Sequence, residues 1–105
     1  MEKYLKNVQQ DVHEDILEGY QERNQDIIRD MLFMGLAEEA GEVVGIGKRI
    51  LRNYDKDKSV ATSEHLCEEL GDVLWYLVGI ADGFGLTLDD IWRYNRKKLE
   101  ERYGD

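Results

Sequence analysis

The sequence Leu36-Ala-Glu-Glu-Ala-Gly-Glu-Val43 returns thirty residues later as Leu66-Cys-Glu-Glu-Leu-Gly-Asp-Val73, with five of eight positions identical. A helix turns by about 100° per residue, so the apolar first, fifth and eighth positions of each copy form one stripe. The acidic fourth and seventh positions lie side by side at the border of that stripe. Each copy therefore predicts an amphipathic helix with two carboxylates at the edge of its core face. Gly41 and Gly71 are expected to allow the two backbones a close approach.

Packing of these two helices against each other would bring four carboxylates together: Glu39, Glu42, Glu69 and Asp72. Four negative charges in a partly dry site repel one another and need compensation. Magnesium prefers oxygen ligands and keeps positions open for water and phosphate oxygens, as metal-assisted phosphate chemistry requires. The alternative interpretation is a solvated acidic helix face without a metal, and the preceding acids Glu38 and Glu68 fit that interpretation best.

The rest of the chain also shows helical periodicity and contains no proline. Apolar residues at spacings of three and four predict helices over about residues 2–22, 28–51 and 63–83. The polar segment 53–63 lacks periodicity and is expected to be a loop. Thr87 and Asp90 form a threonine-x-x-acid start signal for a fourth helix that runs to Tyr103. These patterns predict an all-α four-helix bundle that forms a single domain over residues 1–105.

Composition restricts the possible classes of protein. A chain of 105 residues with 42% hydrophobic residues can build one core, and self-association would add burial. The net charge of -9 disfavours binding to nucleic acid or to an anionic membrane surface. The longest apolar run, Val73–Ala81, is too short to cross a bilayer. Residues 1–6 lack an apolar signal core and Cys67 is the only cysteine, so we expect a cytoplasmic location.

Basic residues are concentrated at the end of the chain. Residues 61–90 contain seven acids and no Lys or Arg, whereas residues 91–99 contain four bases and no acid. On the fourth predicted helix, Asn95, Lys98 and Arg102 share a face with apolar residues, so their polar ends are expected to point toward the bundle. Such cations opposite a carboxylate cluster suit a polyphosphate. The alternative is that Lys98 and Arg102 complement the dipole of the helix C-terminus.

Other reactive residues show weaker patterns. Tyr76 lies on the same margin as Glu69 and Asp72 and is a candidate for stacking on a nucleobase. Neither histidine follows a glutamate by three residues, so the Glu-x-x-His signature of di-iron bundles is missing. Cys67 has no cysteine or histidine partner at a recognisable spacing and is expected to be a small packed thiol.

Taken together, the motifs resemble those of the MazG-type nucleoside triphosphate pyrophosphohydrolases, which form an all-α superfamily. The resemblance covers roughly residues 32–103. The family pattern EExxE, a spacer and ExxD is met by residues 38–42 and 69–72, and the ending Asn95-Arg-Lys-Lys-Leu-Glu-Glu-Arg-Tyr103 adds to it.

This resemblance implies that Glu39, Glu42, Glu69 and Asp72 bind Mg²⁺, with Mn²⁺ as a substitute, and that Glu38 orients the attacking water. Asn95, Lys98, Arg102 and Tyr103 match family positions for phosphate and sugar contacts. The implied reaction converts a nucleoside triphosphate, such as a deoxynucleotide or a noncanonical one, into monophosphate and pyrophosphate. The family usually works as a dimer or tetramer, so a homo-oligomer is expected to complete the bundle.

Two alternatives stay open at this point. Within the superfamily, the substrate could instead be phosphoribosyl-ATP. Outside it, the chain could be a noncatalytic helical interaction module that binds metal only for assembly.

Overall fold

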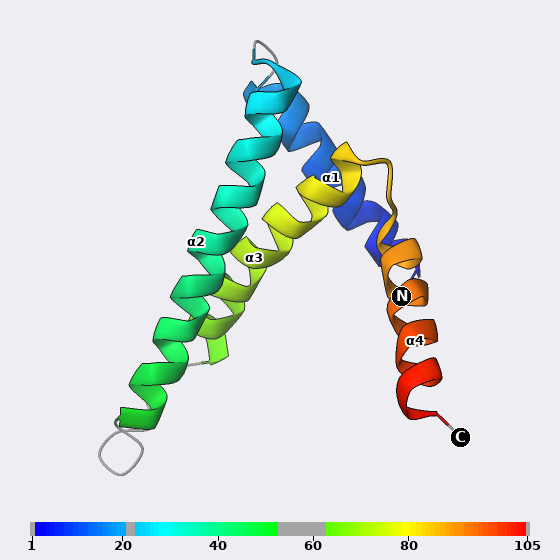
Figure 1. The fold of residues 1–105 in the computed structure, drawn as a ribbon. Helices are drawn as coiled ribbons and strands as arrows, with labels where there is room; N and C mark the ends of the chain where they lie inside the picture. Colours follow the sequence, from blue (N-terminus) through cyan, green and yellow to red (C-terminus); the bar gives the residue numbers. More distant parts are fainter. Residues whose placement is uncertain (1, 21–22, 53–62, 105) are drawn as a thin grey trace. The chain divides into compact units, whose positions relative to one another are not determined.

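The computed structural model describes residues 2–20, 23–52 and 63–104, with side chains from residue 6 onward. These residues form four helices and no strand (Figure 1): α1 (Glu2–Tyr20), α2 (Gln25–Arg52), α3 (Ser63–Gly83) and α4 (Leu88–Tyr103). The predicted all-α class and the four helices are confirmed. The predicted loop over residues 53–63 lies outside the described residues, except that Ser63 is the first residue of α3. None of the described helices combines the length and apolarity needed to cross a membrane.

The chain divides into two compact units. One unit consists of Met1–Asn24 together with Val78–Asp105, and the other consists of Gln25–Leu77. The boundary falls inside α3, after Leu77. Both copies of the repeated acidic motif, residues 36–43 and 66–73, therefore lie in the second unit.

In the first unit, the end of α3 and the start of α4 are fixed by backbone hydrogen bonds. The amide of Gly85 donates to the carbonyl of Asp82, and the amide of Leu86 donates to the carbonyl of Ala81. This pattern is a Schellman motif, and it requires the left-handed backbone that Gly85 adopts at φ 71°. The predicted start signal of the fourth helix is confirmed, because Thr87 is the N-cap and forms a capping box with Asp90.

Helix α1 is attached to this turn through two side chains. The amide group of Gln9 donates from Nε2 to the carbonyl of Leu86 (2.8 Å) and accepts through Oε1 from the amide of Leu88 (3.3 Å). One turn further along α1, Nδ1 of His13 lies 2.5 Å from Oδ2 of Asp82. The buried Val12 lies beside them on α1. The side chains of Gln9 and His13 therefore form a polar clasp that holds α1 against the connection between α3 and α4.

In the second unit, α2 and the first part of α3 run antiparallel side by side (Figure 1). Helix α2 continues for 28 residues through four glycines, and Ile28, Leu32 and Ile46 are its buried side chains. The expectation that Gly41 and Gly71 mediate close approach is wrong, since a Cβ at either position would meet no atom within 4 Å. The close contact lies at Gly35 instead, where a Cβ would overlap the ring of Tyr76.

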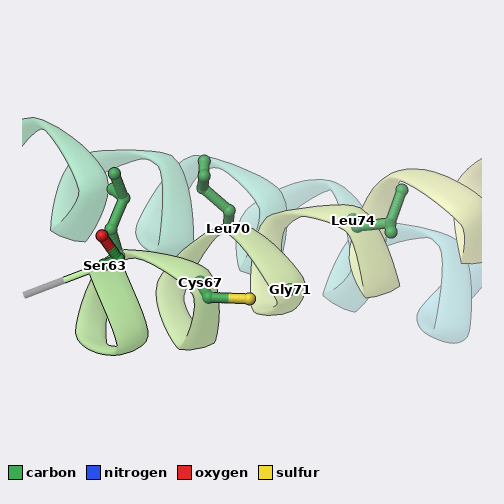
Figure 2. A pocket seen from close by; sticks show the side chains of 6 residues that line it. Ser63, Cys67, Leu70, Gly71 and Leu74 are labelled. Carbon is green, nitrogen blue, oxygen red and sulfur yellow. The ribbon is translucent and has the colours of Figure 1, made fainter.

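The predicted apolar stripe of the repeated motif is only partly covered. Ala40 and Leu70 are exposed, whereas the other stripe positions of both copies are half-buried. Along α3 an apolar groove of about 390 Å³ is lined by Ser63, Leu66, Cys67, Leu70, Gly71 and Leu74 (Figure 2). The expected packed position of Cys67 is wrong, because its thiol lies exposed in this groove.

Candidate metal centre

Three of the four predicted ligands converge between α2 and α3. Glu39, Glu69 and Asp72 each present one carboxylate oxygen, and these oxygens all lie within 4.8 Å of one another. Glu39 and Glu69 are half-buried and Asp72 is exposed, so the cluster opens to solvent on one side. The two copies of the repeat bring their acids together in this way because the helices that carry them are antiparallel neighbours.

Glu42, the fourth predicted ligand, lies against Glu69 although it is not part of the three-residue cluster. A hydrogen bond that its protonated form shares with Glu69 raises the pKa of Glu42, and the charge of Glu69 and partial desolvation raise it further. Two ionised carboxylates have no proton to share, so at neutral pH the protein holds this contact only at an electrostatic cost.

Glu39 has the same tendency to retain a proton. Partial loss of hydration raises the pKa of Glu39, and the surrounding negative charges add to the effect: Glu42, Asp72, Glu38 and Glu69. The carboxylate at the centre of the cluster is thus surrounded by like charge, and a bound cation would relieve that repulsion.

Glu69 gives the most direct indication that the cluster accepts a cation. Its Oε2 atom is buried and accepts no hydrogen bond from the described residues. A buried oxygen without a donor costs free energy, and such atoms in native proteins usually have a partner. The other ligand atoms within reach are carboxylate oxygens, which are the donors that Mg²⁺ prefers. The residues present therefore fit a hard divalent cation.

The remaining predicted site residues occupy different positions. Glu38 is exposed on α2, next to Glu39. Tyr76 is half-buried, packs against Gly35 and makes an edge contact with Trp75 at a centroid distance of 5.1 Å.

The predicted phosphate and sugar ligands lie on α4, in the first unit. Asn95 is half-buried, but Lys98, Arg102 and Tyr103 are exposed. Lys98 and Arg102 therefore reach solvent, and their expected orientation toward a bundle interior stays a prediction. Their role as phosphate ligands stays a prediction.

Two neighbours of the cluster were not predicted from the sequence. Nε2 of His65 lies 3.5 Å from Oε1 of Glu69, and the spacing of four residues on a helix could have revealed this contact. Gly35 is the second, and no local pattern marks it, because its contact with Tyr76 depends on how α2 and α3 pack.

The fold and the site define an all-α protein with a carboxylate centre between two antiparallel helices. Residues 29–105 match the family model of the MazG nucleotide pyrophosphohydrolase domain. The chain belongs to this family.

Two relatives are also similar to the chain. Gene 37 protein of Mycobacterium phage L5 is 38% identical over 69 residues, which cover 66% of this chain and 60% of the phage protein. Uncharacterized protein YvdC of Bacillus subtilis (strain 168) is 34% identical over 77 residues, covering 65% of this chain and 69% of YvdC. The chain thus spans less than two thirds of the phage relative. No solved structure matches the chain.

Proposed function

We propose that the chain is a Mg²⁺-dependent pyrophosphohydrolase that converts nucleoside triphosphates into monophosphates and pyrophosphate. The observation that carries this proposal is the convergence of Glu39, Glu69 and Asp72, with a buried Glu69 oxygen that has no donor among the described residues. Membership of the MazG family supports the reaction class. The names of the two relatives state no activity, so the substrate is proposed from chemistry alone.

In this proposal Glu39, Glu69 and Asp72 hold Mg²⁺, and Glu42 joins them from its position against Glu69. Mg²⁺, or Mn²⁺ in its place, would neutralise phosphate charge and lower the pKa of the attacking water. Glu38 is exposed beside Glu39, where a carboxylate can accept a proton from a water molecule and orient it toward the α-phosphorus.

Binding of the polyphosphate requires positive charge, because a chain of net charge -9 repels it. We assign phosphate binding to Lys98 and Arg102, which are exposed and free to reach an anion, and sugar contacts to Asn95 and Tyr103. Tyr76 is the candidate for contact with the nucleobase. The exposed cations then bind the negatively charged phosphates of the substrate, and the clustered carboxylates bind the metal ion.

We further propose that residues 1–105 act as one domain, in the cytoplasm, as a homodimer or homotetramer. Large apolar side chains are exposed on every one of the four described helices, including Leu17, Met34, Leu51, Leu74 and Trp92. Self-association would cover part of this apolar surface and add burial to a small chain.

The experiment is product analysis on a panel of nucleoside triphosphates and phosphoribosyl-ATP, with and without Mg²⁺. The proposal predicts monophosphate and pyrophosphate in the presence of Mg²⁺ only. Asp72→Asn should lower the rate roughly 10- to 100-fold or more through the lost ligand. The matched control is Glu64→Gln, which neutralises an exposed acid on the same helix outside the cluster.

Diphosphate and phosphate as products would contradict the proposed reaction. Turnover of phosphoribosyl-ATP alone would replace the proposed substrate, and metal-dependent oligomerisation without turnover would replace catalysis by an interaction role.

A further inference from the structure

A glycine of α2 lies directly against an aromatic ring of the first part of α3. A Cβ at Gly35 would overlap Cδ1, Cε1 and Cζ of Tyr76, whereas a Cβ at Gly41, Gly45 or Gly47 on the same helix would meet nothing within 4 Å. Glycine in a helix interior costs about 1 kcal/mol relative to alanine. At position 35 the missing side chain therefore makes room for a specific neighbour.

This contact lies one helical turn from the carboxylate cluster on both helices. Gly35 precedes Glu39 by four residues on α2, and Tyr76 follows Asp72 by four residues on α3. Residues four apart lie on one face of a helix. The contact and the cluster therefore lie on successive turns of the same two helices, inside one compact unit.

The ring of Tyr76 also contacts its neighbour in the sequence. Trp75 meets it edge-on, with a centroid distance of 5.1 Å and an interplanar angle of 80°, a favourable arrangement for two aromatic rings. The ring therefore packs against Trp75 of α3 as well as against Gly35 of α2.

The cluster is sensitive to small changes in that spacing. Mg²⁺ binds oxygen at about 2.1 Å in octahedral geometry, so neighbouring oxygens on one ion are about 3 Å apart. The three oxygens lie within 4.8 Å of one another, so a change of about 1 Å in the separation of the helices is large on the scale of the coordination shell. A side chain at position 35 would push the helices apart.

We propose that Gly35 and Tyr76 form a positioning pair that sets the separation of α2 and α3 at the metal centre. This inference rests on the proposed function, because it assigns the pair to the binding of the catalytic metal. The ring of Tyr76 is the part that matters, and its hydroxyl is not needed for the spacing.

The test measures Mn²⁺ binding to the full chain without nucleotide, by calorimetry and by the loss of the electron paramagnetic resonance signal of free Mn²⁺. Gly35→Ala should weaken binding about tenfold or more, as changes outside the ligand shell commonly do. The matched control is Gly47→Ala, which makes the same substitution on the same helix where a Cβ meets nothing. It should bind Mn²⁺ as wild type does.

A double-mutant cycle identifies the cause. Tyr76→Leu removes the ring that a Cβ would strike, so Gly35→Ala should have less than a twofold effect in that background. Tyr76→Phe keeps the ring and should bind Mn²⁺ as wild type does, whereas Tyr76→Leu alone should bind more weakly. If Gly35→Ala does not fold, the comparison of Tyr76→Phe with Tyr76→Leu still tests whether the ring is needed for Mn²⁺ binding.

The inference is overturned if Gly35→Ala binds Mn²⁺ as Gly47→Ala does, if the two losses simply add in the cycle, or if Tyr76→Phe and Tyr76→Leu bind equally. Glu69→Gln separates this failure from failure of the proposed function. If Glu69→Gln abolishes binding and Gly35→Ala does not weaken it, only the positioning pair is wrong. If wild type binds no Mn²⁺, or Glu69→Gln binds it equally well, the metal centre is wrong and the positioning pair falls with it.

Discussion

Nε2 of His65 lies 3.5 Å from Oε1 of Glu69, one turn earlier on α3. The two oxygens of Glu69 thus have different surroundings, since Oε1 faces the imidazole and Oε2 is buried without a donor among the described residues. We expect the imidazole to restrain the position of this carboxylate.

The first prediction concerns this restraint. His65→Ala should weaken Mn²⁺ binding roughly tenfold, because groups that orient a ligating carboxylate typically contribute that much to metal affinity. The helical circular dichroism spectrum should be unchanged, since His65 is partly exposed. Equal affinity of His65→Ala and wild type in a Mn²⁺ titration would show that Glu69 needs no such restraint.

The second prediction is a pH dependence of stability in the metal-free protein. The pKa values of Glu39 and Glu42 are raised in the folded state, so this state binds their protons more tightly than the unfolded state does. The resulting stabilisation is present below the unfolded pKa, about 4.3, and is lost as the pH rises through the raised values.

Glu42→Gln removes one of these charges without changing the size of the side chain. It should therefore raise the free energy of unfolding more at pH 7 than at pH 4, as measured by urea denaturation in the presence of a chelator. The same gain at both pH values would be inconsistent with repulsion between Glu42 and Glu69.

The third prediction concerns the start of α4. Oγ1 of Thr87 accepts from the amide of Asp90 (3.0 Å), and Oδ2 of Asp90 accepts from the amide of Thr87 (3.1 Å). Thr87→Ala should reduce stability by about 1 kcal/mol, and Thr87→Ser should retain most of it. Hydrogen bonds from the backbone and side chain of Thr87 lower the pKa of Asp90, so the part of the stability that the Asp90 carboxylate contributes is lost as the pH falls through the lowered value. Urea denaturation of the three proteins at pH 7 checks the deficit, and equal stability of Thr87→Ala and wild type would argue against the capping box.

The fourth prediction concerns the clasp on α1. Gln9→Ala removes two hydrogen bonds to the backbone of Leu86 and Leu88, and should cost about 1 to 3 kcal/mol. The adjacent Gln10→Ala is the matched control, because the hydrogen bond of the Gln10 side chain within the described part of the chain goes to the exposed Glu14 on its own helix. Hydrogen exchange of the Leu88 amide should accelerate in Gln9→Ala but not in Gln10→Ala. Equal exchange rates in the two variants would show that Gln9 does not protect the Leu88 amide.

The sequence was sufficient to predict the elements of the fold because their signals are local. Periodicity located all four described helices, and the Thr87–Asp90 spacing located the start of α4. The repeated acidic motif also predicted which carboxylates meet, since two amphipathic helices of the same register can cover their apolar stripes by pairing with each other.

Features that depend on the separation of helices were not predictable in the same way. Gly41 and Gly71 looked like contact points by their place in the repeat, yet Gly35 has the contact, because the helix surfaces touch one turn away from the acids. The exposure of Leu70 and Cys67 was likewise missed, since the stripe of α3 is wider than the surface that its neighbours cover.

The proposed function requires that a metal ion held by Glu39, Glu69 and Asp72 promotes attack of water on the α-phosphorus of a nucleoside triphosphate. Hydrolysis in ¹⁸O-labelled water with Mg²⁺, followed by mass spectrometry of both products, shows which phosphorus is attacked. We expect label in the monophosphate and none in the pyrophosphate, and loss of this reaction in Glu69→Gln. Label in the pyrophosphate, or undiminished turnover by Glu69→Gln, would contradict the proposed function.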